Sequence, residues 1–325
     1  MHIGDIVVIG GSGFLGCHVS RLLENSQFSH TIADLHNGAD FSNYFRADVT
    51  DISSLRKLAG AKCFINLAAE HRDDVIPVSK YDDVNVEGAK NVCQAASELG
   101  VEKIVFTSSV AIYGFASSKT DESGQPNYFN DYGRTKYLAE QVYLEWQKME
   151  PEKRTLVILR PTVIFGEGNR GNVFNLFQQI QKKRFVMIGN GRNKKSMAYV
   201  ENVSACVIHC LSFDRGVHIY NYVDEPSFDM NTLVTIIRST LFNKNNTGFR
   251  IPKLFGLFVG LIFDMFGKII GKSFSISRIR MKKFTSNSEF STSIKNTGFV
   301  PKIKLRDALI KTLNHEFKNK PSEKL

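Results

Sequence analysis

The chain has 325 residues, 42% of them hydrophobic and 23% charged, which is the composition of a globular protein with a sizeable core. Its five cysteines are scattered without a Cys-x-x-Cys pair, so neither a disulfide framework nor a metal site is expected. The formal net charge of +10 is spread along the chain rather than gathered on one reading element, which disfavours a nucleic-acid partner.

The first half of the chain alternates short β-rich runs with helical stretches. Strands are predicted at Ile6–Ile9, Thr31–Ala33, Phe64–Leu67, Lys103–Thr107 and Thr155–Leu159. Helices are predicted at Gly13–Glu24, Val84–Leu99 and Asp131–Met149. This alternation predicts an α/β protein with a Rossmann-type, doubly wound parallel sheet and helices on both of its faces.

The regular alternation of strands and helices ends near residue 165, and this change divides the chain into two parts. We expect residues 1–165 to form the cofactor-binding Rossmann domain, with strands near 197–200 and 219–222 returning to it. Residues 166–325 mix short helices and strands less regularly, and we expect them to form mainly a smaller C-terminal α/β substrate-binding lobe.

A glycine-rich turn follows the first strand directly and opens the first helix. Its sequence is Gly10-Gly11-Ser12-Gly13-Phe14-Leu15-Gly16. Gly10 permits the tight turn, Gly13 lets the backbone approach a pyrophosphate, and Gly16 lets the helix pack closely on the strand. The free N–H groups at the start of the helix then face the phosphates of a dinucleotide.

Three further segments are expected to bind the same dinucleotide. Asp34 ends the second strand, where a carboxylate binds ribose hydroxyls and repels a 2′-phosphate, so NAD is favoured over NADP. Asp48 and Val49 follow the third strand and are placed to contact adenine. Leu67, Ala68 and Ala69 end the fourth strand with side chains small enough for a cofactor to pass.

Candidate catalytic residues lie at the end of the next strand and on the long amphipathic helix. Tyr132 and Lys136 are four residues apart, which places both side chains on one helical face. An ammonium beside a phenol lowers its pKa from about 10, so Tyr132 can exchange a proton with a sugar hydroxyl while the carbon exchanges a hydride. Ser109 is placed to donate a hydrogen bond to the reacting oxygen.

Taken together, these motifs resemble those of the extended short-chain dehydrogenase/reductases, the NAD-dependent epimerase/dehydratase family. The resemblance runs from Ile6 to about residue 205 and reappears at 298–301. The matching residues are the glycine turn, Asp48, Leu67-Ala68-Ala69, Asn85, Gly88, Ser108-Ser109, Tyr113-Gly114, Tyr132, Lys136 and Arg160-Pro161.

The resemblance implies roles for further residues. Ser109 is implied as the catalytic serine, and Ser108 is implied to lie near the nicotinamide, where Tyr132 and Lys136 also contact the cofactor. Family members that dehydrate sugars carry an Asp-Glu pair just after the catalytic hydroxyl residue. Val110 and Ala111 stand there in this chain, which disfavours a dehydratase.

The substrate is expected at the segment Gly168–Asn175, which is similar to the family's diphosphate-contacting segment. Asn172 is the leading candidate contact and Arg170 the second, and Ser109 completes the site from the catalytic side. Lys195 occupies a place where relatives often hold a phosphate-binding arginine. For Arg170 and Lys195 a solvated surface role remains an equal alternative.

The resemblance implies an enzyme of nucleotide-sugar chemistry in surface polysaccharide biosynthesis, with a UDP-sugar as its substrate. UDP-hexose 4-epimerases and bacterial UDP-4-keto-6-deoxy-N-acetylhexosamine 4-reductases are both similar, so epimerase and 4-ketosugar reductase stay open. Two alternatives remain: a 3β-hydroxysteroid-dehydrogenase-like enzyme acting on a lipid-like alcohol, and a non-catalytic NAD-binding regulator. The family also implies a homodimer.

The start of the chain and one apolar run bear on location. The first residues lack the pattern of a signal peptide, so a cytoplasmic protein is expected. Leu254–Phe263 is apolar but shorter than the roughly 20 residues that a membrane-spanning helix needs. Two interpretations of this run stay open, a buried helix of the substrate lobe and an association with a membrane surface through its basic flanks.

Overall fold

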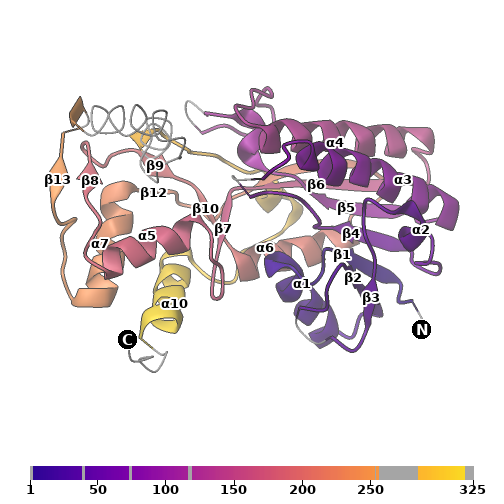
Figure 1. Cartoon of the computed structure of the whole chain (residues 1–325), viewed down its shortest axis with the longest axis horizontal. Helices are drawn as coiled ribbons and strands as arrows, with labels where there is room; N and C mark the ends of the chain where they lie inside the picture. The colour runs from indigo at the N-terminus through magenta and orange to yellow at the C-terminus, as the bar shows by residue number, and fades with distance from the viewer. Residues whose placement is uncertain are drawn as a thin grey trace.

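The computed structural model describes residues 3–38, 41–72, 75–115, 119–252, 254–255 and 285–318. Figure 1 shows a larger part built around a sheet and a smaller part formed by the later segments of the chain. Most of the run Leu254–Phe263 lies outside the described residues, so only its first two residues can be placed.

A seven-stranded parallel sheet forms the larger part and confirms the predicted fold class. The strand order is β11-β6-β5-β4-β1-β2-β3, and every neighbouring pair is parallel. The strands are β1 (Ile6–Ile9), β2 (His30–Asp34), β3 (Tyr44–Arg46), β4 (Cys63–Asn66), β5 (Lys103–Thr107), β6 (Thr155–Pro161) and β11 (Gly216–Tyr222).

Helices cover both faces of this sheet, because its central strands are apolar on both sides (Figure 1). Helices α3 (Gly88–Leu99) and α4 (Asp131–Met149) pack on one face, and α1 (Phe14–Asn25) and α6 (Val200–His209) on the other. Shorter helical pieces lie between them: α2 (Ile52–Leu55), η1 (Asp82–Glu87, a π-helix), and the 3₁₀ turns η2 (Val110–Tyr113), η3 (Cys210–Ser212) and η4 (Ile294–Thr297).

The smaller part has a core of its own between three helices. These are α5 (Asn172–Gln181), α7 (Met230–Phe242) and α10 (Leu305–Phe317). Three two-stranded sheets accompany them: β7 (Val163–Phe165) with β10 (Met197–Tyr199), β8 (Met187–Ile188) with β13 (Arg250–Ile251), and β9 (Lys194–Lys195) with β12 (Phe228–Asp229).

The two later strands that were expected to return to the Rossmann domain behave differently. The one near 219–222 is part of β11, the edge strand of the main sheet. The one near 197–200 is β10, which pairs with β7 in a separate sheet. Met197 and Tyr199 of β10 are buried in the core of the smaller part, together with Phe165 of β7, so β10 packs with that part instead.

Within the described part of the chain, no helix combines the length and apolar character needed to cross a bilayer. The same residues contain no cluster of histidine, cysteine and carboxylate groups that could hold a metal ion. All five cysteines are free thiols.

A buried ion pair joins α4 to the sheet. Both Glu140 oxygens accept hydrogen bonds from Arg160 at 2.9 and 2.7 Å, and the Glu140 side chain is fully buried. Arg160 also donates to the Tyr113 hydroxyl at 2.7 Å, which in turn donates to Asn221 of β11 at 3.0 Å. This chain of contacts links α4, β6, η2 and β11 in one network.

We predict that Glu140→Ala lowers the free energy of unfolding by about 3–5 kcal/mol, because it leaves the Arg160 guanidinium buried without its carboxylate. Denaturant unfolding measures this. The matched control is Glu145→Ala on the same helix, which removes an exposed pair with Lys148 at 3.7 Å and is expected to leave stability unchanged. Equal losses in the two variants would contradict the assignment.

Candidate active site

The turn between β1 and α1 brings two backbone segments too close for any side chain. Gly10 has φ +76°, and a Cβ on it would lie 2.6 Å from the Ala68 nitrogen. A Cβ on Gly16 would lie 2.3 Å from the Gly10 carbonyl oxygen. Gly10 therefore forms the predicted tight turn, whereas Gly16 lets α1 approach the turn itself rather than the strand.

The residues present fit the diphosphate of a dinucleotide. Gly13 caps α1 without a side-chain hydrogen bond, and a Cβ built on it would meet only the Gly10 carbonyl within 4 Å, so the space beyond is open. The Ser12 hydroxyl is buried with no hydrogen-bond partner among the described residues. Phe14 and Leu15 form the first turn of α1, whose N–H groups and dipole favour an anion here.

Asp34 links the end of β2 to this turn. One carboxylate oxygen accepts from the Ser12 nitrogen at 2.9 Å and the other from the Leu35 nitrogen at 2.7 Å. Holding Ser12 in place is thus a structural role of Asp34, and contact with a ribose stays a prediction.

The adenine-side residues lie beyond β3. One oxygen of the Asp48 carboxylate accepts from both the nitrogen and the hydroxyl of Thr50, each at 2.8 Å. Val49 is buried against Gly88, where a Cβ would lie 2.9 Å from its side chain, and the Val49 carbonyl accepts from Asn91 at 2.8 Å. These contacts fix the segment, and its contact with adenine stays a prediction.

The segment after β4 is held by a buried amide that sequence reasoning identified only through the family motif. Leu67, Ala68 and Ala69 are half-buried there. Asn85 accepts from the Glu70 nitrogen at 2.8 Å, donates to the Glu70 carbonyl at 3.0 Å, and donates to the Thr135 hydroxyl at 2.9 Å. Asn85 thereby ties this segment to α4.

Tyr132 lies in the first turn of α4, whose start is fixed by its cap. Asn130 accepts from the Gly133 nitrogen at 3.0 Å, and Arg134 donates to both oxygens of Asp82 at 2.8 and 2.6 Å. The sequence analysis did not predict a role for Asn130, Arg134 or Asp82. A polar residue just before a predicted helix was the only available signal.

The structure brings Ser109 and Tyr132 together. Ser109 caps η2 by accepting from the Ala111 nitrogen at 3.1 Å, and a side-chain hydrogen bond joins it to Tyr132. Burial raises the pKa of Tyr132, whereas the hydrogen bond from Ser109 favours the phenolate and lowers it. Of the other two candidate catalytic residues, Ser109 is therefore the one that is hydrogen-bonded to the phenol in this structure.

Lys136 lies one turn further along α4 and is almost completely buried, with 2% of its surface exposed. Burial lowers the pKa of Lys136 to about 7, although the nearby Glu140 carboxylate raises it. Its ammonium lies 4.3 Å from the centre of the Phe106 ring. The pKa of Tyr132 is shifted by burial, by the hydrogen bond to Ser109 and by Tyr81. A lowering of this pKa by Lys136 therefore stays a prediction.

Ser108 directly follows β5 and has a second buried hydroxyl without a partner among the described residues. Its nitrogen donates to the Leu159 carbonyl at 2.7 Å. Ser12 and Ser108 both follow strands of the same sheet, at its carboxyl edge, where ligands of such folds bind. Two unpartnered hydroxyls at this edge fit a polar ligand such as NAD.

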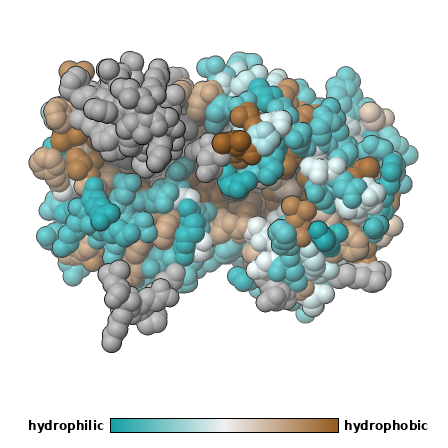
Figure 2. All heavy atoms as spheres, viewed as in Figure 1, coloured by the Kyte–Doolittle hydropathy of each residue, from teal (hydrophilic) through white to brown (hydrophobic). Residues whose placement is uncertain are grey.

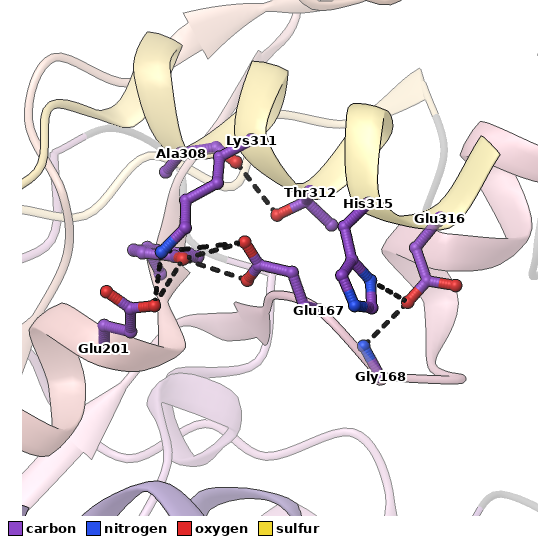
Figure 3. Close-up of polar contacts among 9 residues, drawn as sticks. Glu167, Gly168, Glu201, Ala308, Lys311, Thr312, His315 and Glu316 are labelled. Atoms are coloured by element: carbon purple, nitrogen blue, oxygen red, sulfur yellow. Dashed lines mark hydrogen bonds and ion pairs between the residues drawn. The ribbon is translucent and has the colours of Figure 1, made fainter. Parts of the chain in front are cut away.

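The expected substrate segment is held by the C-terminal helix (Figure 3). Glu316 of α10 has only 1% of its side chain exposed, and its carboxylate accepts from the Gly168 nitrogen at 2.7 Å and pairs with Arg170 at 3.1 Å. Arg170 also lies 4.3 Å from the centre of the Phe174 ring. Sequence reasoning missed Glu316, because nothing local signals a contact across 148 positions.

Figure 3 also shows a second set of polar contacts, between Lys311 of α10 and the carboxylates of Glu167 and Glu201. Lys311 of α10 pairs with Glu201 and lies 3.8 Å from Glu167, and the Tyr199 hydroxyl donates to the Glu167 carboxylate at 2.9 Å. Helix α10 therefore fixes both ends of the loop between β7 and α5.

The other two candidate substrate residues lie apart from one another in the lobe. Asn172 is the exposed first residue of α5. Lys195 of β9 donates to the Ser286 carbonyl at 2.8 Å and to the Ser288 hydroxyl at 3.4 Å, and burial lowers its pKa to about 8. The structure thus engages Lys195 with the C-terminal segment, and its contact with a phosphate stays a prediction.

Comparison with known proteins identifies relatives of the chain. The model of the NAD dependent epimerase/dehydratase family matches residues 6–222. An Escherichia coli O157:H7 protein named N-acetyl-alpha-D-glucosaminyl-diphospho-ditrans,octacis-undecaprenol 4-epimerase is 42% identical over 322 residues, which cover 96% of this chain and 95% of that protein.

Solved structures share the fold at lower identity. MoeE5 in complex with UDP-glucuronic acid and NAD has a TM-score of 0.75 at 21% identity, covering 96% of this chain and 98% of its own. The UDP-N-acetylglucosamine 4-epimerase from Bacillus cereus has a TM-score of 0.73 at 19% identity, covering 95% and 98%.

The lowered pKa of Lys136 predicts how stability changes with pH. Between about pH 7 and pH 10 the unfolded chain holds a proton on this lysine that the folded chain lacks, so stability rises with pH by up to about 1.4 kcal/mol per unit. Denaturant unfolding of the cofactor-free protein at several pH values measures this slope. Lys136→Met should flatten it, and an unchanged slope would show that the lysine stays charged when buried.

Proposed function

Because the chain belongs to the NAD-dependent epimerase/dehydratase family, we propose that it inverts carbon 4 of an N-acetylhexosamine that is linked through a diphosphate to a polyprenol. The observation that carries this proposal is the 42% identity to the Escherichia coli 4-epimerase, which extends over nearly the full length of both chains. NAD is the cofactor of the family. The proposal moves the expected substrate from a UDP-sugar to a lipid-linked sugar.

The diphosphate is common to both kinds of substrate. The similar solved structures include proteins in complex with UDP-sugars, and that likeness supports a shared fold rather than a shared leaving group. Asn172 and Arg170 are proposed to contact the diphosphate, since they border the loop that α10 holds in place. A role in surface polysaccharide synthesis follows from this class of substrate.

In the proposed reaction, NAD supplies a reversible acceptor for the hydrogen on carbon 4 of the sugar. Tyr132 takes the proton of the carbon-4 hydroxyl as that C–H bond breaks, and returns it to the oxygen once the C–H bond has reformed on the other face. Ser109 donates a hydrogen bond to the reacting oxygen and holds the phenol in place. Lys136, when protonated, is proposed to supply the positive charge that favours the phenolate.

The residues beside Ser109 limit the chemistry. Val110 and Ala111 have no acid or base, so this part of the site cannot remove a second proton to eliminate water. Epimerisation needs only one proton-transfer group and a turn of the oxidised sugar that presents its other face to the cofactor. A ketosugar reductase would use the same residues but would consume reduced cofactor.

The test is an assay with purified protein and no added NADH. N-acetylglucosaminyl-diphospho-undecaprenol in detergent is expected to equilibrate with its 4-epimer. The two are distinguished by releasing the sugar with acid and separating it by chromatography. UDP-N-acetylglucosamine is the parallel substrate and is expected to react much more slowly. Turnover of the UDP-sugar at an equal rate would overturn the lipid-linked assignment, and a strict need for added NADH would favour the reductase.

We predict that Tyr132→Phe lowers kcat by about 10²–10⁴-fold, which is the usual contribution of a general acid–base group. NAD binding should stay nearly intact, because the phenyl ring keeps the packing at the start of α4. Tryptophan quenching or calorimetry with NAD supplies the binding control. Full activity in this variant would remove Tyr132 from the mechanism.

A further inference from the structure

Three large apolar side chains are exposed at the end of the smaller lobe. Phe249, Leu254 and Phe255 have 71%, 82% and 57% of their surface exposed. Phe249 is fixed in this position, because its carbonyl accepts from the Met187 nitrogen at 2.9 Å and the next residue begins β13. Hydrophobic surface is visible in Figure 2 at the end of the molecule where Figure 1 places β8 and β13.

The charge around these side chains has one sign. Residues 172–195 and 230–255, which include α5, β8, α7 and β13, contain no aspartate or glutamate. They contain six lysines and arginines in the first segment and four in the second. Lys182, Lys183 and Arg184 are exposed where α5 leads into β8, and β8 pairs with β13 beside Phe249.

Arg250 fixes one of these charges beside Phe249. Its guanidinium donates to the Asn231 side chain at 2.7 Å and to the Asn190 carbonyl at 3.3 Å, and both acceptors are uncharged. An exposed apolar patch rimmed by cations that have no carboxylate partner within the described ranges is the surface chemistry of a protein that rests on anionic lipid.

We propose that this end of the lobe, formed by Phe249, Leu254 and Phe255 with Lys182–Arg184 and Arg250, docks on an anionic phospholipid bilayer. The apolar side chains enter the boundary between headgroups and acyl chains, and the cations face the lipid phosphates. A second copy of the chain is disfavoured as the occupant, since a symmetric contact would oppose two cationic surfaces.

The position of the surface agrees with a lipid-linked substrate, and in this respect the inference rests on the proposed function. Helix α5 begins at Asn172 beside the expected diphosphate segment and ends at Gln181, next to the docking surface. A helix of 10 residues spans about 15 Å. A polyprenol attached to a diphosphate near Asn172 can therefore reach a bilayer at this end of the lobe.

Vesicle sedimentation tests the proposal with the full-length protein. Wild type is expected to sediment with vesicles of equal parts phosphatidylcholine and phosphatidylglycerol, and at least tenfold less with phosphatidylcholine alone. The combined variant Phe249→Ser, Leu254→Ser and Phe255→Ser is expected to lose at least tenfold in partition to the anionic vesicles. The control variant Met149→Ser with Val300→Ser removes side chains of similar exposure, 73% and 76%, elsewhere on the surface and should bind like wild type.

A charge variant tests the other half of the surface. Lys182→Gln, Lys183→Gln and Arg184→Gln together should weaken binding to anionic vesicles and reduce its dependence on salt. Unchanged melting temperatures show that these exposed substitutions leave the fold intact. Equal binding by wild type and the apolar variant, or equal binding of wild type to neutral and anionic vesicles, would overturn the proposal.

Activity separates this proposal from the proposed function. In detergent, where no bilayer is present, the apolar variant should epimerise the lipid-linked sugar as fast as wild type. With the same substrate in anionic vesicles it should be at least tenfold slower, and equal rates there would count against the docking surface. If wild type binds vesicles through these residues but leaves the lipid-linked sugar unchanged, the docking surface stands and the proposed substrate is wrong.

Discussion

One buried carboxylate, Glu140, balances two positive charges beside α4, those of Arg160 and Lys136. It accepts hydrogen bonds from two of the three guanidinium nitrogens of Arg160 at the end of β6. Its charge also raises the pKa of Lys136, one turn away on α4. A carboxylate with no exposed side-chain surface is stable only with such partners. The Glu140–Arg160 pair therefore holds α4, the helix that carries Tyr132, against the end of β6.

Much of the sheet and the cofactor turn could be predicted, because both are specified by local patterns. The glycines between β1 and α1 serve contacts with neighbouring backbone, and the alternation of strands and helices sets the layers. Contacts between distant segments are not marked by any local sequence pattern and could not be predicted. The hydrogen bond from Gly168 to Glu316 and the pairing of β10 with β7 both depend on how distant segments of the lobe pack together.

The candidate substrate residues show the same limit. The sequence motif places a basic residue near the expected substrate site but does not say which residue it contacts. In the structure Arg170 pairs with Glu316, and Lys195 donates to the Ser286 carbonyl. The electrostatics of Lys136 were also beyond the sequence, since a lysine facing a predicted cleft gives no sign of complete burial. What the motifs of the sequence did predict was the family, and the family match over residues 6–222 confirms it.

Strand β11 has a consequence for how such enzymes can diversify. The chain completes β6, passes through β7, α5 and several strands of the lobe, and only then supplies the edge strand of the sheet. The lobe is thus interleaved with the nucleotide-binding half rather than appended to it, so neither half corresponds to one continuous stretch that recombination could exchange. New specificity then arises by replacing segments within the lobe while each connection between the lobe and the sheet is kept.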